Sequence, residues 1–226
     1  MVWRDGAGDA ATVDGAFGSG DVRQETDGTE VAILGSASAG STRFTVGRAG
    51  SADTANVLVF AQSATAGTAR IDVHGKGFVS GSGNAALFTD ASSAGNATIG
   101  NQGAIVAFAD TASAGTATIQ NQAGGLVYFG TAASAGSASI TNGAGSTLDV
   151  SGMTAPGGLA IGSLAGGGAV VLGGTRLTLG GTNANDAISG TVSDKGSFFP
   201  QPGTGTGGAI VKVGSGTLTL TGANSY

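Results

Sequence analysis

The sequence predicts an all-β protein built as a parallel β-helix, in which short strands stack coil upon coil. The main observation is a phrase that occurs five times: an apolar residue, an Ala-Gly pair that ends seven places later, and an apolar residue four places after the glycine. This internal spacing is constant, whereas successive phrases follow after 27, 28, 20 and 21 residues. A fixed unit with variable insertions is typical of a solenoid. The leading residues are Ile33, Phe60, Phe88, Phe108 and Phe129, and the glycines are Gly40, Gly67, Gly95, Gly115 and Gly136.

The second observation is that polar and apolar residues alternate within each phrase, which indicates strands rather than helices. After the glycine, the even places carry small or apolar residues and the odd places carry polar ones. Two places before each leading residue stands another apolar or small residue, which predicts a second strand. The predicted inward positions are Thr42, Ala69, Ala97, Ala117 and Ala138, then Phe44, Ile71, Ile99, Ile119 and Ile140, with Val31, Leu58, Ala86, Val106 and Val127 on the second strand. The predicted outward positions include Arg43, Arg70, Asp72, Thr118 and Gln120.

Composition is the third observation. The chain has 45 glycines in 226 residues, 10% charged residues, 40% hydrophobic residues and three prolines. Glycine at each corner allows a positive φ, and the alanine before it forms a small-residue column, so the backbone can turn sharply. Like residues then stack about 4.8 Å apart from coil to coil. We therefore expect one elongated domain with a slender core, and without cysteine it contains no disulfide or thiolate metal site.

The chain divides into three regions. Residues 1–30 are an acidic N-terminal segment or first coil, which holds seven of the fourteen acidic residues. Asp5 and Asp9 on a glycine turn suggest calcium binding, but a single copy favours a solvated first coil. Residues 31–150 form the coils of the five phrases. Residues 151–226 continue the coils, with a projecting loop expected at 181–208 and a contact there through Phe198 or Phe199 left open.

Targeting and charge limit the possible locations and partners. The start MVWRDGAGDA lacks the basic and apolar regions of a signal peptide, and no run of about 18 apolar residues predicts a membrane helix. We therefore expect the chain to be an internal piece of a longer protein. Its nine basic residues are dispersed over a chain of net charge −5, which predicts no nucleic-acid binding.

An asparagine column occupies an inward position six places after three of the glycines. Its members are Asn101, Asn121 and Asn142, whereas Val46 and Val73 stand there in the first two coils. Asparagine can hold a ligand, but stacked amides that bond each other and the turning backbone explain the spacing without one. We favour this structural interpretation.

Residues with catalytic potential are few. Asp72, Asp90 and Asp110 are predicted to face outward, and Asp90 and Asp110 share one column about 5 Å apart, as paired carboxylates of a glycan-cleaving enzyme would. Gly35, Gln62 and Thr131 occupy the same column, which indicates a tolerant surface position.

The other candidates also favour structural roles. His74 is expected in an exposed turn and Lys212 at a solvated strand edge. The G-x-G-x-x-G letters at 203–208 lead into a strand, whereas dinucleotide binding requires a helix. We predict no catalytic, cofactor-binding or metal-binding residues and no cofactor.

The C-terminal residues carry a family resemblance. Residues 208–226 read GAIVKVGSGTLTLTGANSY, with Leu218 and Leu220 predicted inward and Asn224 and Tyr226 predicted at the next corner. This stretch resembles the autotransporter-associated β-strand repeat of Gram-negative passenger domains. Residues 159–183 are similar to the coils that precede it in that family.

The resemblance implies a right-handed β-helix that is exported through a C-terminal outer-membrane barrel of the same precursor and folds at the cell surface. It implies a structural stalk, not an enzyme, that supports secretion and folding, with adhesion or aggregation through host or bacterial glycans or proteins also open. The alternatives are a polysaccharide-processing β-helix and a secreted structural repeat protein without a barrel. We also expect the isolated chain to self-associate through its open strand edges.

Overall fold

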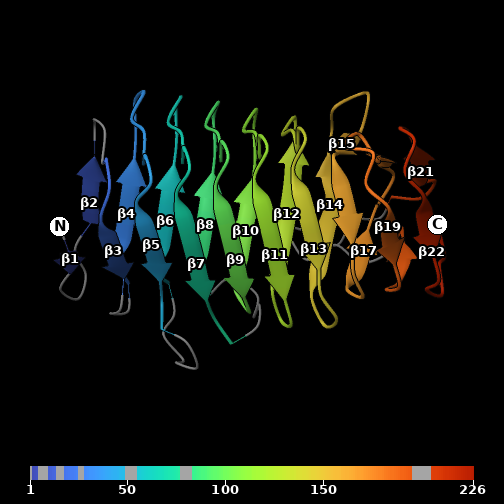
Figure 1. The fold of residues 1–226 in the computed structure, drawn as a ribbon, viewed down its shortest axis with the longest axis horizontal. Coiled ribbons are helices and arrows are strands. Elements are labelled where there is room, and N and C mark those ends of the chain that lie inside the picture. Colours follow the sequence, from blue (N-terminus) through green and yellow to red (C-terminus); the bar gives the residue numbers. More distant parts are fainter. Residues whose placement is uncertain are drawn as a thin grey trace.

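The computed structural model describes residues 2–4, 10–13, 18–24, 28–48, 55–76, 83–194 and 205–226. Within these ranges the protein is all-β, without a helix, and its strands stack along one long axis from the N-terminal to the C-terminal end (Figure 1). The paired strands in these ranges all run parallel to their neighbours. The prediction of an all-β fold with parallel strands is therefore confirmed.

Two long sheets contain most of the strands, and the chain visits them alternately. Sheet A consists of β1 (Val2–Arg4), β3 (Asp21–Gln24), β5 (Arg43–Val46), β7 (Arg70–His74), β9 (Thr98–Gln102), β11 (Thr118–Gln122), β13 (Ser139–Asn142) and β16 (Ser163–Ala165). Sheet B consists of β2 (Ala10–Val13), β4 (Glu30–Ile33), β6 (Val57–Phe60), β8 (Ala85–Phe88), β10 (Ile105–Phe108), β12 (Leu126–Thr131), β14 (Thr147–Met153), β17 (Ala169–Val171) and β20 (Val192–Ser193).

The connections explain why the spacing inside the phrase is constant whereas the spacing between successive phrases varies. Each phrase runs from a strand of sheet B through a corner of constant length into a strand of sheet A. The return connections differ: they span residues 47–56 and 75–84 in the first two coils, but only 103–104 and 123–125 in the next two. The long steps of 27 and 28 residues therefore arise in these return connections.

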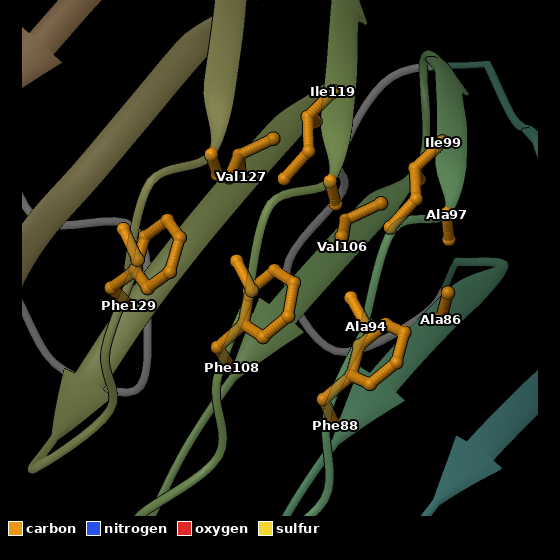
Figure 2. Close-up of a cluster of buried hydrophobic side chains, with 14 of the residues drawn as sticks. Ala86, Phe88, Ala94, Ala97, Ile99, Val106, Phe108, Ile119, Val127 and Phe129 are labelled. Carbon is orange, nitrogen blue, oxygen red and sulfur yellow. The ribbon is translucent and has the colours of Figure 1, made fainter. Parts of the chain in front are cut away.

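The core lies between the two sheets and is built from columns of like residues. The five leading residues are paired in register along sheet B and are fully buried. The rings of Phe60, Phe88, Phe108 and Phe129 stack at centroid distances of 4.8 Å, with interplanar angles of 4°, 11° and 9°. Figure 2 shows three of these rings beside the valines and isoleucines of the neighbouring columns. Every predicted inward residue of the five phrases is buried.

The corner glycines have the predicted backbone conformation and also make a close approach that was not predicted. Gly40, Gly67, Gly95, Gly115 and Gly136 have φ between 56° and 62°. A Cβ atom on Gly115 would lie 2.5 Å from the carbonyl oxygen of Gly95, and one on Gly95 would lie 2.7 Å from that of Gly67. The corner therefore excludes a side chain because of both its φ and the coil stacked against it.

The last coils contain three strands instead of two. A third sheet, β15 (Leu159–Ile161), β18 (Arg176–Leu179) and β21 (Ala209–Lys212), enters the path, and β19 (Asp186–Ile188) pairs with β22 (Leu218–Leu220). The structure differs from the predicted loop at 181–208, since β19 and β20 lie within that range and β20 pairs with β17. The rest of that prediction, including Phe198 and Phe199, falls on 195–204, outside the described residues.

The acidic first region contains strands that belong to the same stack. Its strands β1 and β3 pair in sheet A, and β2 pairs with β4 in sheet B. Asp5 and Asp9, the pair considered for calcium, lie outside the described residues.

Candidate functional site

The asparagine column is a hydrogen-bonded ladder, as predicted. The Nδ2 atom of Asn101 donates to Oδ1 of Asn121 at 2.9 Å, and Nδ2 of Asn121 donates to Oδ1 of Asn142 at 2.8 Å. Each Nδ2 atom also donates to a backbone carbonyl on the following coil, at Leu126, Thr147 or Ala169. The three side chains are at most 2% exposed. Their polar atoms serve the turning backbone, so the ladder supports a structural role rather than a ligand site.

The first coils use a different set of amides, which the sequence pattern did not reveal. Val46 and Val73 occupy the ladder position there. Asn56 and Asn84, in the return connections, form the buried amide hydrogen bonds of these coils instead. Asn56 Oδ1 accepts from the backbone N–H of Thr29 at 3.2 Å, and Asn84 Oδ1 accepts from that of Asn56 at 3.0 Å. Both asparagines stand four places before the leading phenylalanine of their phrase, but Thr29, Ala104 and Gly125 occupy that place in the other phrases, so no repeated residue type marked the column.

Asp90 and Asp110, the candidate carboxylate pair, have a conformational role. One surface column, exposed except at the half-buried Gly35, has φ between 55° and 65°, in the left-handed region; its members are Gly35, Gln62, Asp90, Asp110 and Thr131. Their side chains cap the backbone of the preceding coil: Asp90 Oδ2 accepts from the N–H of Gln62 at 2.8 Å, and Asp110 Oδ2 from that of Asp90 at 3.2 Å. The position is therefore less tolerant than predicted, because the residue there must adopt a left-handed backbone conformation.

Asp72 was predicted to face water, but the structure buries its side chain. It lies on the outward side of β7, but it is only 3% exposed because two arginines cover it. Arg70 binds it in a bidentate manner, through Nε and Nη2 at 2.8 Å each, and Arg43 on the neighbouring coil adds a bond from Nη2 at 3.0 Å. The hydrogen bond to Asp72, followed by its charge, raises the pKa of Arg70 above its ordinary value.

A small apolar cluster lies on the outward side of sheet B. Tyr128 is 7% exposed and packs with Ala107 and Leu126, while Leu87 and Ile105 border them. Burial, followed by the charge of Asp149 on the next strand, raises the pKa of Tyr128 above its ordinary value of 10.0. The tyrosine is therefore neutral and structural at ordinary pH.

The buried carboxylates of the C-terminal half also bind backbone donors. Asp149 accepts from the N–H of Ser151 at 2.9 Å, and Asp186 accepts from the N–H of Leu164 at 3.2 Å. Asp194 accepts from the N–H groups of Gly207 and Gly208 at 2.8 and 3.1 Å. Asp149 thus bonds the backbone two residues further on, Asp186 bonds strand β16 of the preceding coil, and Asp194 bonds the residues that lead into β21.

The remaining candidate residues lie at the ends of strands or in the turns beside them. His74 lies at the end of β7 and is half-buried rather than in an exposed turn, with Nδ1 unpaired among the described residues. Lys212 donates to the carbonyl oxygens of Val213 and Gly214 and so closes its own turn. Residues 205–208 lead into strand β21, as predicted, although Gly203 and Thr204 lie outside the described residues.

Asn224 shapes the last corner as predicted, since its Oδ1 accepts from the N–H of Val192 at 2.9 Å. Tyr226 is 44% exposed. Leu218 and Leu220 are partly buried and pack against the core, in agreement with their predicted direction.

A hollow of about 380 Å³ opens beside the ends of β14, β18 and β21. Met153, Thr154, Pro156 and Arg176 line it, with glycines from the neighbouring turns. Arg176 is exposed and is its one charged lining residue in the described part of the chain. The described residues provide this hollow with no second ionisable group for acid–base chemistry.

Neither a metal centre nor a membrane helix emerges from the described ranges. No group of three histidine or acidic side chains is placed to hold a metal ion there. Those ranges also contain no helix long and apolar enough to cross a bilayer.

Comparison with known proteins gave no match to a family model, a curated protein or a solved structure.

Proposed function

We propose that this chain is a right-handed parallel β-helix from the passenger of an autotransporter and acts as a structural stalk at the cell surface. The observation that carries the proposal is the register of the stack: like residues lie on like residues from coil to coil, and the segment that resembles the autotransporter-associated repeat, 208–226, supplies β21 and β22 of the same stack. A rod held by contacts between neighbouring coils can fold progressively as it emerges from a pore.

The distribution of polar groups supports a stalk rather than an enzyme. The carboxylates of Asp90, Asp110, Asp149, Asp186 and Asp194 bind backbone N–H groups, and the carboxylate of Asp72 binds two arginines. A glycosidase requires two carboxylates that face a common substrate. We therefore propose no catalytic activity, and no observation favours the polysaccharide-processing alternative.

The proposal includes the partners and the location that such a stalk implies. The chain would be anchored by a C-terminal barrel of its own precursor, on the surface of a Gram-negative bacterium. Its long sheet faces would meet glycans or proteins of host or bacterial surfaces, or other copies of the chain. With a net charge of −5 it is not proposed to bind nucleic acid.

The experiment that tests anchoring is to read the gene beyond the codon for Tyr226. We expect a segment of alternating strands of about ten residues that ends the reading frame, as outer-membrane barrels have. A stop codon without such a segment would overturn the anchored stalk and favour the secreted repeat protein.

A further inference from the structure

Asn96 differs from every other asparagine of the chain in what its side chain contacts. It is exposed in the corner turn just before β9, and its Oδ1 atom accepts from the hydroxyl of Thr116 at 2.5 Å. In the part of the chain that the structure describes, its Nδ2 atom has no hydrogen-bond partner. The other asparagine side chains each bond a backbone N–H or carbonyl group; they are Asn56, Asn84, Asn101, Asn121, Asn142, Asn183, Asn185 and Asn224.

The corner itself does not require an asparagine at this place. The residue one place after the corner glycine carries a hydroxyl in the other four phrases, as Ser41, Thr68, Thr116 and Ser137. The hydroxyls of Ser41, Thr68 and Thr116 donate to the carbonyl oxygen of a glycine on the preceding coil. The side chain of Asn96 makes no such bond to Gly67, the described glycine in the corresponding place. Corner packing therefore leaves the amide of Asn96 without a structural role.

The exposed amide begins an acceptor sequence for N-linked sugars. Asn96-Ala97-Thr98 has the Asn-x-Ser/Thr form, and none of the other asparagines has serine or threonine two places later. Alternation along the chain places Asn96 and Thr98 on the outward side, where both are exposed, while Ala97 is buried in the core. The structure therefore exposes the Nδ2 atom that would carry the sugar and the hydroxyl residue of the acceptor sequence on one face.

We propose that Asn96 is an N-glycosylation site. The donor is a sugar activated as a phosphate ester of a nucleotide or a lipid. A bond forms between the anomeric carbon and Nδ2, the bond from that carbon to the phosphate oxygen breaks, and the phosphate leaves with the electron pair while a base of the modifying enzyme takes the amide proton. The product keeps Oδ1, so the hydrogen bond from Thr116 is retained, and the exposed side chain gives the sugar access to solvent.

The modification has to precede folding of this coil. Ala97 is fully buried, and the N–H groups of Asn96 and Thr98 donate to the carbonyl oxygens of Gly67 and Ala69 on the preceding coil. Strand β9 is also paired on both sides, with β7 and β11. An enzyme cannot draw these residues into its active site without opening the stack. Glycosylation therefore requires only that the unfolded chain meets such an enzyme, and it does not depend on anchoring at the cell surface.

The test is mass spectrometry of the complete gene product, purified from the cells that naturally produce it and digested with chymotrypsin. Cleavage after Phe88 and Phe108 releases residues 89–108, which contain Asn96 and, as an internal control, Asn101. We expect this peptide to carry the added mass of one or more sugar residues, which fragmentation places on Asn96. Single hexoses would indicate a nucleotide-linked donor, and an oligosaccharide of fixed mass a lipid-linked one.

Four variants produced in the same cells test the acceptor sequence. Asn96→Gln and Thr98→Ala should abolish the modification, whereas Thr98→Ser should retain it. Thr118→Ala removes an exposed threonine at the register-equivalent place of β11 and is the matched control, which should be modified like the wild type. An unmodified wild-type peptide would overturn the proposal. So would a sugar located on a serine or threonine, or a modification that persists in Thr98→Ala.

Discussion

The rings of Phe88 and Phe108 lie 4.8 Å apart and 11° from parallel, one coil above the other. Isolated aromatic pairs prefer offset or edge-to-face contacts, so the strand spacing of the sheet imposes this parallel stack. Phe44 is the exception: it meets Phe60 edge-on at 6.1 Å because it belongs to sheet A rather than to the column of leading residues. The register of the coils therefore determines how the core is packed.

Removal of one ring from this column should strongly destabilise the protein. Phe108→Ala deletes a fully buried side chain between two rings and should lower the free energy of unfolding by about 3–5 kcal/mol. Val213→Ala, at a site 41% exposed, is the control and should change it by less than about 0.5 kcal/mol. Urea titration followed by circular dichroism measures both, and similar losses would contradict the stacked core.

A side chain at a corner glycine should disturb two coils. Gly115→Ala places a Cβ at φ 61° and 2.5 Å from the carbonyl oxygen of Gly95. The conformation alone costs about 1–3 kcal/mol, and the contact adds to it. Gly157→Ala, where a Cβ meets nothing within 4 Å, should leave the unfolding midpoint nearly unchanged. Equal midpoints for the two variants would show that the corners are not in contact.

The amide ladder should depend on its middle member. Asn121→Ala removes one hydrogen-bond partner each from Asn101, Asn142 and the backbone carbonyl of Thr147, and a buried polar group left unpaired costs about 1–3 kcal/mol. Asn96→Ala removes an exposed asparagine of the same coil stack as a control. Chemical denaturation distinguishes the two, and a loss as small for Asn121→Ala as for Asn96→Ala would rule out a stabilising ladder.

The column of Asp90 and Asp110 should respond to backbone conformation rather than to charge. Because Asp110 has φ 56°, Asp110→Val should lose about 1–3 kcal/mol, while Asp110→Gly should be much better tolerated. The melting temperatures of the two variants provide the measurement. Because both variants lack the carboxylate that caps Asp90, a glycine variant no more stable than the valine variant would contradict the conformational requirement.

Tyr128 should make the protein less stable at high pH. Its pKa in the folded protein is raised above 10.0, mainly by burial, so above about pH 10 the unfolded chain loses this proton while the folded chain keeps it. The contribution is therefore intact below pH 10 and declines as the pH rises further. The fall in unfolding free energy between about pH 9 and about pH 11 should be smaller in Tyr128→Phe than in the wild type. An equal fall in unfolding free energy in the two proteins would show that a group other than Tyr128 is responsible.

Much of the stack could be predicted because one coil repeats the pattern of the next. Constant offsets revealed the phenylalanine column, the corner glycines and the Asn101–Asn142 ladder. By contrast, the left-handed column of Gly35, Gln62, Asp90, Asp110 and Thr131 contains four residue types, so its shared φ left no pattern in the sequence.

The remaining features depend on contacts between coils that sequence spacing does not show. Asp72 is buried by Arg43, which lies 29 residues away and reaches it only because β5 and β7 are in register. The strand at 186–188 contains a single buried apolar residue, Ile188, within a polar segment, so composition alone indicated a loop.

The most direct test of the proposed surface stalk is protease treatment of intact cells that produce the native, complete gene product. An antibody raised against this chain is used to follow it, and a periplasmic protein serves as the control for membrane integrity. We expect the protease to remove the antibody signal from intact cells while the periplasmic protein survives. Survival of both proteins until the cells are lysed would contradict a surface location, provided that the purified chain is cleaved under the same conditions.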